Sequence, residues 1–219
     1  MKENLTELVF ILDRSGSMQS MQEEAIGGFN AFLEDQKKVP GEAKLTLVLF
    51  DHEYNLVHNG KDINDIESLC SDTYAPRGTT ALLDAIGRTV DDVGKRLAET
   101  PEEERPSKIL VAVLTDGLEN ASRDYKKAKI NEMITHQRDK YCWEFIFLGA
   151  NQDAIAEGSS LGVSKIYSMT YSATPNGMKN GMRSMSYAAS SYRRTGKVDL
   201  KDVDQNTEDK DVISVSDKK

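Results

Sequence analysis

Apolar residues follow two patterns that alternate along the chain. Short unbroken apolar runs, such as residues 8–12 and 109–114, are typical of strands buried on both faces of a parallel sheet. Longer segments, such as residues 19–37, carry apolar residues every three or four positions and predict helices with one buried face. This alternation predicts an α/β fold of the doubly wound, Rossmann-like kind, with a mostly parallel sheet and helices on both faces.

The expected elements can be placed from these patterns and from the turn residues between them. Pro40-Gly41 follows the first helix, and the polar turn Asp51-His52-Glu53 connects two strands as a hairpin. We expect strands at residues 8–13, 44–50, 54–58, 109–114, 143–148 and 165–169, and helices at residues 19–37, 81–98, 123–140, 153–161 and 177–194. Residues 196–219 are rich in Lys and Asp and poor in apolar residues, so we expect a charged, disordered tail after a folded domain of residues 1–195.

The first apolar run ends in a group of oxygen-bearing side chains. Asp13, Ser15 and Ser17 occupy alternate positions, and Gly16 between them lets the backbone curl. In an extended strand these side chains would be too far apart to share one ion, but in a curled loop they could converge. Hard oxygen ligands of this kind suit Mg²⁺, Ca²⁺ or Mn²⁺ rather than zinc. Ser and Asp after a strand are also common loop formers and helix caps, so this segment alone does not decide between the two roles.

Two further segments would bring oxygen ligands to the same place. Residues 76–86 form a turn followed by a helix start, with Thr79 and Thr80 at the junction. The apolar run 109–114 is followed by Thr115-Asp116-Gly117. In open α/β sheets, ligands bind outside the carboxyl ends of the strands, where such loops gather. All three segments are therefore expected at one edge of the sheet.

The order of these motifs, Asp-x-Ser-x-Ser, then Gly-x-Thr before a helix, then Thr-Asp-Gly after a strand, resembles the von Willebrand factor type A (vWA) family over roughly residues 5 to 195. Thr80 is chosen over Thr79 because the helix that follows it then falls in the family's usual register. The resemblance also implies one antiparallel edge strand, which the hairpin would supply. That family has a metal-ion-dependent adhesion site (MIDAS), whose metal-associated residues correspond here to Asp13, Ser15, Ser17, Thr80 and Asp116.

The resemblance implies binding of a partner protein rather than catalysis. Ser15, Ser17 and Thr80 would coordinate the ion as neutral hydroxyls, while Asp13 and Asp116 would act directly or through water. An ion held largely by neutral ligands stays electrophilic and keeps an open position, where an Asp or Glu carboxylate of a partner can replace a water. The expected cofactor is Mg²⁺, with Mn²⁺ or Ca²⁺ as alternatives. Stand-alone bacterial domains of the family often belong to larger assemblies, and we expect this chain to be of that type.

Two other interpretations stay open. In the first, the protein is an Mg²⁺-dependent phosphatase or hydrolase with Asp13 as nucleophile and Asp116 holding the ion. Against it, phosphatases of the haloacid dehalogenase type have a second Asp two residues after the nucleophile, where this chain has Ser15. In the second, the domain is structural and its metal site is vestigial. Against it, a residue of the expected type stands at every one of the ligand positions.

Three more acidic residues lie next to the loops of the candidate site. Asp51 follows a strand, Asp84 lies one turn into the helix after Thr80, and Glu119 extends the loop of Asp116. Asp51 could belong to the site or simply cap a turn, and Asp84 could support the site or stabilise the helix N-terminus through the helix dipole. Glu119, together with Asn120, could contact a partner at the rim of the site.

Composition argues against several other classes of protein. The formal net charge is −8 and no stripe of Lys and Arg is present, which argues against nucleic-acid binding. No apolar run approaches the roughly 20 residues needed to span a membrane, and no secretory signal is recognisable after Met1. Cys70 and Cys142 have neither metal-ligand nor disulfide-framework spacing, although a single bridge between them stays open. We therefore expect a cytoplasmic protein that contacts neither nucleic acid nor membrane.

Overall fold

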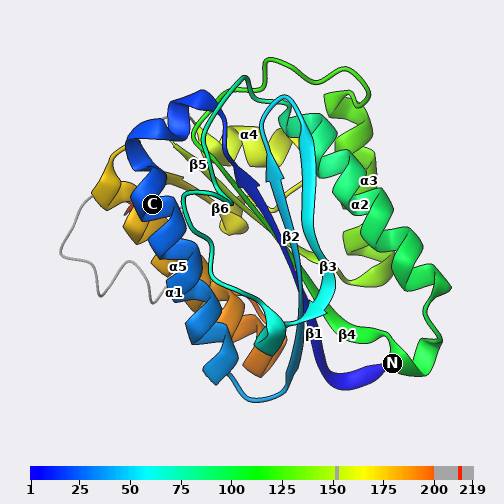
Figure 1. Cartoon of the computed structure of the whole chain (residues 1–219). Coiled ribbons are helices and arrows are strands. Elements are labelled where there is room, and N and C mark those ends of the chain that lie inside the picture. Colours follow the sequence, from blue (N-terminus) through cyan, green and yellow to red (C-terminus); the bar gives the residue numbers. More distant parts are fainter. Residues whose placement is uncertain (151–152, 200–211, 214–219) are drawn as a thin grey trace.

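A single twisted sheet forms the centre of the molecule (Figure 1). In the computed structural model, which describes residues 1–150, 153–199 and the backbone of 212–213, its strands follow the order β3-β2-β1-β4-β5-β6-β7. The strands are β1 (Lys2–Asp13), β2 (Glu42–Phe50), β3 (Tyr54–Asp62), β4 (Pro106–Thr115), β5 (Glu144–Ala150), β6 (Ser168–Tyr171) and β7 (Val212–Ile213). The helices are α1 (Gln22–Lys38), α2 (Leu82–Glu99), α3 (Lys127–Tyr141), α4 (Ala154–Ser160) and α5 (Pro175–Thr195).

Most neighbouring strands run parallel, as the apolar runs predict. β1 pairs in parallel with β2 and β4, and β5 joins β4 and β6 in the same direction. At one edge β3 runs antiparallel to β2, which confirms the expected antiparallel edge strand. At the other edge the two-residue β7 is antiparallel to β6, an addition that the sequence pattern did not indicate.

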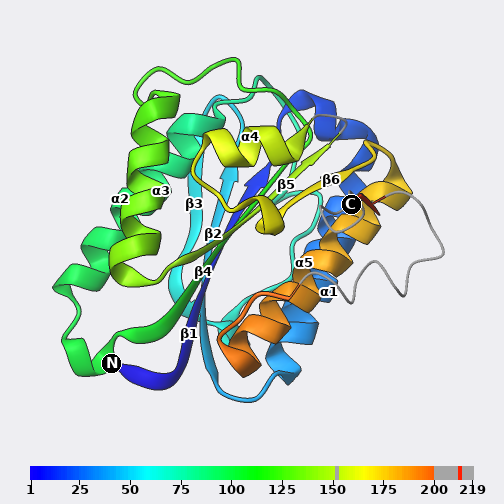
Figure 2. The ribbon, with the colours of Figure 1, turned by 180° about the vertical axis from the view of Figure 1, so that it is seen from behind.

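The two faces of the sheet carry separate apolar cores. Helices α1 and α5 cover one face, while α2, α3 and α4 cover the other (Figures 1 and 2). Successive residues of a strand point to opposite faces. Along β1, Leu8, Phe10 and Leu12 therefore pack on the side of α1 and α5, while Val9 and Ile11 pack on the side of α2 and α3. Burial on both faces explains the unbroken apolar runs, and the predicted doubly wound α/β fold is confirmed.

Several element boundaries differ from the expectation. β1 begins at Lys2 rather than at residue 8, and β3 continues to Asp62 rather than ending at residue 58. Helix α3 begins at Lys127 rather than at residue 123, because the Asp84 carboxylate accepts hydrogen bonds from the N–H groups of residues 123, 124 and 125 (2.8 to 3.0 Å) and holds them in a loop. The strand expected at residues 165–169 begins instead with a turn of 3-10 helix at Lys165–Tyr167. This turn leaves Ile166 60% exposed, and β6 follows it.

The expected tail, residues 196–219, lies largely outside the described residues. Within the described part, Val198 is buried in the core on the side of α1 and α5, and β7 pairs with β6. The packed structure therefore extends past residue 195. Disorder of the rest of the tail stays a prediction.

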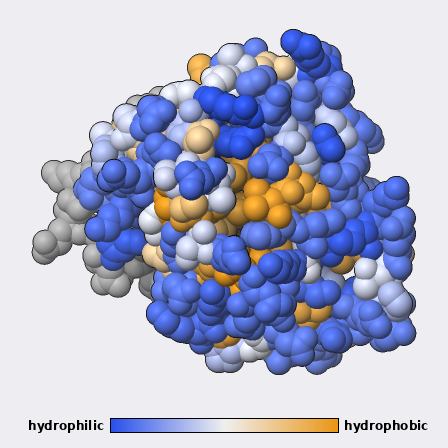
Figure 3. Space-filling view, in the orientation of Figure 1, coloured by the Kyte–Doolittle hydropathy of each residue, from blue (hydrophilic) through white to orange (hydrophobic). Residues whose placement is uncertain are grey.

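Hydrophilic residues cover most of the face shown in Figure 3, and apolar atoms gather in its middle, in front of the sheet. Leu118, in the loop after β4, is one of the few large apolar side chains that are strongly exposed, at 67%. Among the described residues, no helix combines the length and the apolar character needed to cross a membrane.

Candidate metal centre

The loops that follow β1 and β4 meet the loop that precedes α2 at the carboxyl edge of the sheet (upper part of Figure 1). Backbone hydrogen bonds connect the first loop with the one before α2: Arg77 N donates to Arg14 O (2.8 Å), and Gly16 N donates to Gly78 O (3.1 Å). Gly78 has a φ of +66°, and a Cβ added at Gly16 would lie 3.3 Å from Gly78 O. Glycine at both positions permits this close approach of two backbones.

Asp13, the last residue of β1, is fully buried. Ser15 N donates to its Oδ1 (2.6 Å) and the Thr115 hydroxyl donates to its Oδ2 (2.5 Å), so the carboxylate connects the ends of β1 and β4. The Tyr74 hydroxyl donates to the carbonyl oxygen of Asp13 (2.6 Å). These contacts fix the position of the carboxylate at the edge of the sheet.

A chain of polar contacts leads from Asp13 through Ser15 and Ser17 to Asp116. The hydroxyl oxygens of Ser15 and Ser17 lie 3.1 Å apart, and the Ser17 hydroxyl donates to Asp116 Oδ1 (2.7 Å). Ser15 is buried and Ser17 is exposed, so the group of oxygen atoms reaches from the interior to solvent. Asp13, Ser15, Ser17 and Asp116, all predicted as ligands, therefore lie together.

Thr80 joins this group from the start of α2. Thr80 N donates to Asn120 Oδ1 (2.9 Å) and Asn120 N donates to Thr80 O (3.1 Å), which fastens Thr80 to the loop of Asp116. A Cβ added at Gly117 would lie 2.8 Å from Thr80 Oγ1, so that hydroxyl lies against the backbone of the residue that follows Asp116. It has no hydrogen-bond partner among the described residues, so its oxygen is available to a ligand. Thr80 is buried whereas Thr79 is exposed, and this geometry favours Thr80.

The candidate site contains buried negative charge without a matching positive charge. The fully buried carboxylates of the described chain are Glu7, Asp13 and Asp51. Glu7 pairs with Arg96 (2.6 Å), and Asp51 pairs with the Nε atoms of two arginines (2.9 and 3.1 Å). Asp13 has no cationic partner in the part of the chain that the structure describes. Burial raises the pKa of Asp13 to about 6, although its hydrogen bonds act in the opposite direction. Burial also raises the pKa of Asp116.

The other acidic residues near the site have structural contacts. Asp51 accepts a hydrogen bond from Glu53 N (2.6 Å) and pairs with Arg14 and Arg77, so it fastens the first two loops together. The Glu119 carboxylate accepts hydrogen bonds from the first turn of α2 and from its own loop. Asp84, as described above, holds residues 123–125. These three carboxylates therefore stabilise the loops.

Three residues that position the ligands were missed by the sequence analysis. They are Tyr74, Thr115 and Asn120, which contact Asp13 or Thr80. Thr115 precedes Asp116 directly within the Thr-Asp-Gly motif, so the motif itself could have indicated it. Tyr74 and Asn120 lie in loops, and no pattern in the sequence marks their contacts.

The oxygen atoms fit a hard divalent cation. They come from two carboxylates and three hydroxyls, without nitrogen or sulfur, and such sets suit Mg²⁺, Mn²⁺ or Ca²⁺. Among the described residues, no group of three or more His, Cys, Asp or Glu side chains could hold a metal ion, and an ion at this position would need the hydroxyl oxygens as well as the two carboxylates. Cys70 and Cys142 are both free and exposed, so the bridge left open by the sequence is not formed.

Comparison with solved structures identifies the fold. Proximal thread matrix protein 1 from the mussel byssus, solved with a zinc-occupied MIDAS motif, aligns with 86% of this chain and 46% of its own, at a TM-score of 0.59 and 16% identity. The vWF domain of the type V pili tip protein Mfa5 from Porphyromonas gingivalis aligns with 91% of this chain and 99% of its own, at a TM-score of 0.59 and 11% identity. A von Willebrand factor type A structure from Catenulispora acidiphila aligns with 86% of this chain and 43% of its own, at a TM-score of 0.57 and 14% identity.

These likenesses show that the chain has the vWA fold, as the motif resemblance implied. The chain spans about half the length of the mussel protein, at 46%. No protein-family model matches the sequence, and no curated protein matches it.

Proposed function

We propose that this protein binds a divalent cation, Mg²⁺ in preference to Mn²⁺ or Ca²⁺, and uses it to bind an Asp or Glu side chain of a partner protein. The observation that carries the proposal is the fully buried Asp13 carboxylate, which has no cationic partner in the described chain. Every other fully buried carboxylate there has an arginine. A cation at this edge would supply the missing positive charge. The ion would be held by Asp13, Ser15, Ser17, Thr80 and Asp116.

The arrangement also leaves a place for a further oxygen ligand. Ser15, Ser17 and Thr80 would contribute neutral oxygens, and an ion with such ligands remains a good Lewis acid toward an incoming carboxylate. Ser17 is exposed, so the ion would be accessible from solvent. The N-terminus of α2 begins beside Thr80 and adds a favourable dipole for an anion.

The contacts of Asp13 favour binding over catalysis. Both of its carboxylate oxygens accept hydrogen bonds, and the residue is fully buried. A phosphatase nucleophile would have to present one of these oxygens to a substrate. We therefore propose a binding module and not an enzyme.

The structural neighbours support the proposal at the level of the fold. The mussel protein was solved with zinc at its MIDAS motif, and Mfa5 is a pilus tip protein. For this chain we propose a bacterial domain that works in the cytoplasm as part of a larger assembly. Its free, exposed Cys70 and Cys142 are compatible with a reducing compartment.

Isothermal titration of chelator-stripped protein with Mg²⁺ and with Mn²⁺ tests the metal site. We expect a single saturable site that is lost in the Asp13→Ala/Ser15→Ala variant. Thr79 and Thr80 offer a matched pair, because Thr80→Ala removes a ligand whereas Thr79→Ala removes an exposed hydroxyl. Equal weakening by both threonine variants, or no binding to the native chain, would contradict the assignment.

Acetate tests the open position. Waters that exchange on bound Mn²⁺ enhance proton relaxation, and acetate that replaces one of them should lower this enhancement. An unchanged enhancement at saturating acetate would show that no carboxylate enters the shell. Hydrolysis of p-nitrophenyl phosphate with Mg²⁺, lost in Asp13→Asn, would instead support the phosphatase alternative.

A further inference from the structure

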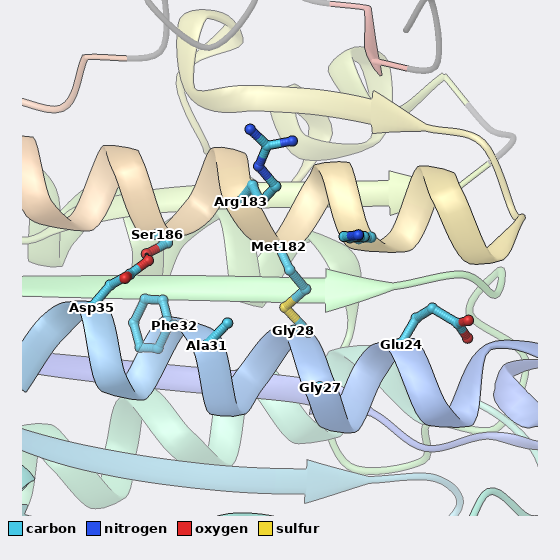
Figure 4. A pocket seen from close by; sticks show the side chains of 10 residues that line it. Glu24, Gly27, Gly28, Ala31, Phe32, Asp35, Met182, Arg183 and Ser186 are labelled. Carbon is cyan, nitrogen blue, oxygen red and sulfur yellow. The ribbon is translucent and has the colours of Figure 1, made fainter. Parts of the chain in front are cut away.

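A groove separates helices α1 and α5 on the outer side of their layer (Figure 4). Its volume is about 370 Å³. In Figure 4, Met182 reaches from α5 onto Gly28 at the base of the groove, and Ser186 meets Asp35 at one end. The groove is lined by Glu24, Gly27, Gly28, Ala31, Phe32, Asp35, Lys179, Met182, Arg183 and Ser186.

Two adjacent glycines explain both the close packing of the helices and the opening above it. A Cβ added at Gly28 would lie 2.5 Å from Met182 Cγ, so glycine is needed there for α1 and α5 to approach each other. A Cβ added at Gly27 would meet nothing within 4 Å. Ala31 is also exposed, one helical turn further on. The stretch of α1 at Gly27 and Ala31 therefore forms a trough without large side chains.

The two walls of the groove carry opposite charge. Helix α1 contributes Glu24 and Asp35, whereas α5 contributes Lys179 and Arg183 and contains no acidic residue along its whole length. Neither Lys179 nor Arg183 forms an ion pair within the described chain. The groove thus presents an acidic row and a basic row side by side, with an apolar base between them.

We propose that this groove is the interface between two copies of the chain. α1 and α5 each follow a strand of the parallel part of the sheet, so they run in the same direction. A two-fold axis along the groove places the acidic α1 of each copy against the basic α5 of the other. An axis across the helices would place α1 against α1 and join two acidic surfaces. Charge therefore selects the first arrangement, in which the stems of Lys179 and Arg183 pack into the trough at Gly27 and Ala31 of the second copy.

A charge-exchange experiment tests this pairing. Sedimentation velocity from about 1 µM to about 100 µM should show a concentration-dependent dimer of the native chain. Lys179→Glu/Arg183→Glu makes both walls of the groove acidic, and Glu24→Lys/Asp35→Lys makes both walls basic. Each double variant alone should weaken the dimer by about tenfold or more, because like charges then face each other. A mixture of the two should restore it as a heterodimer.

Two controls separate the interface from effects on folding. Gly27→Arg fills the trough where the monomer has open space, so it should abolish the dimer without lowering the melting temperature. Lys95→Glu/Lys129→Glu makes the same charge change on α2 and α3, which cover the other face of the sheet, and should leave the dimer intact.

A native chain that is monomeric throughout the concentration range would overturn the proposal. So would variants that do not weaken the dimer, or a mixture of the two double variants that stays monomeric. Because none of these residues belongs to the metal site, the outcome does not depend on the proposed function.

Discussion

Strand β1 buries one carboxylate in its middle and one at its carboxyl end, but only the first has a positive charge beside it. In the middle of the strand, Glu7 accepts hydrogen bonds from the Arg96 guanidinium (2.6 Å) and from the Thr46 hydroxyl (2.7 Å). At the end of the strand, Asp13 is equally buried and receives only neutral donors, from Ser15 and Thr115. One strand therefore has two equally buried carboxylates, of which Glu7 has a cationic partner and Asp13 has none in the described chain.

Glu7 with its arginine belongs to the contacts that hold the fold together, whereas Asp13 belongs to the candidate metal site. The ion pair of Glu7 fastens α2 to the middle of the sheet, and Arg96 also donates to Asn59 of β3 (2.8 Å). Ionisation of the buried Asp13 carboxylate lowers the free energy of unfolding, because the charge loses its hydration without gaining a positive partner. A cation from solution that completes the site would offset this cost. The predictions that follow test this comparison from the largest effect to the smallest.

Arg96→Ala should have the largest effect on stability. It leaves the buried Glu7 carboxylate without its cation, and breaking such a pair typically costs about 3–5 kcal/mol. Urea unfolding measures the loss. Glu7→Leu/Arg96→Met removes both charges and should cost much less. A small loss in Arg96→Ala would mean that the two buried carboxylates of β1 do not differ as described.

In the absence of metal, Asp13→Asn should raise the free energy of unfolding, whereas Arg96→Ala should lower it. The pKa of Asp13 is raised from 3.8 to about 6 in the folded state, so above pH 6 the group is ionised both folded and unfolded, and its burial opposes folding. The neutral variant should therefore be more stable, by up to about 3 kcal/mol at pH 8, at about 1.4 kcal/mol for each pKa unit. Below about pH 3 the native side chain is protonated in both states, and the gain should disappear. Urea unfolding in chelator at both pH values checks the sign. Lower stability of the variant at pH 8 would refute the claim of uncompensated charge.

Asn120→Ala should weaken metal binding without removing a ligand. Asn120→Ala removes the side-chain acceptor of Thr80 N and keeps the backbone hydrogen bond from Asn120 N to Thr80 O, and loss of such a supporting contact typically lowers metal affinity by about 10- to 100-fold. Titration with Mn²⁺ measures the change. Asn120→Asp keeps the acceptor oxygen and should retain more of the affinity than Asn120→Ala. Unchanged affinity in Asn120→Ala would show that the clamp does not position Thr80.

The pH dependence of Mg²⁺ affinity should show the smallest effect. A proton competes with the ion for Asp13, whose pKa is about 6. Affinity should be nearly constant above pH 7 and fall by about tenfold for each pH unit below 6. Titrations at pH 5 and pH 7 are sufficient to see it. Equal affinity at both values would mean that the ion does not require ionised Asp13.

The motif-bearing parts of the molecule could be predicted from the sequence, and the supporting contacts could not. The apolar runs that end at Asp13 and before Asp116 indicate strands whose carboxyl ends meet, which is enough to bring these residues together. Glycine at positions 16 and 78, each within one of the recognised motifs, allows the loops to approach. Asn120 acts through a contact 40 residues away in sequence. From the sequence alone, a polar loop residue that hydrogen-bonds to a distant backbone atom cannot be distinguished from one that faces solvent.

The hydrogen bond from Ser17 to Asp116 joins residues 99 positions apart, and the Thr80 hydroxyl, from a third segment, lies against Gly117, the residue after Asp116. An ion bound among them would act as a reversible cross-link between the start, middle and second half of the chain. Closing such long loops is entropically costly, so a bond that holds them closed acts on the unfolded and partly opened states more than on the folded contacts. Loading with Mg²⁺ would then slow the local opening of the loops at the carboxyl edge, and hydrogen exchange there would report the concentration of free ion.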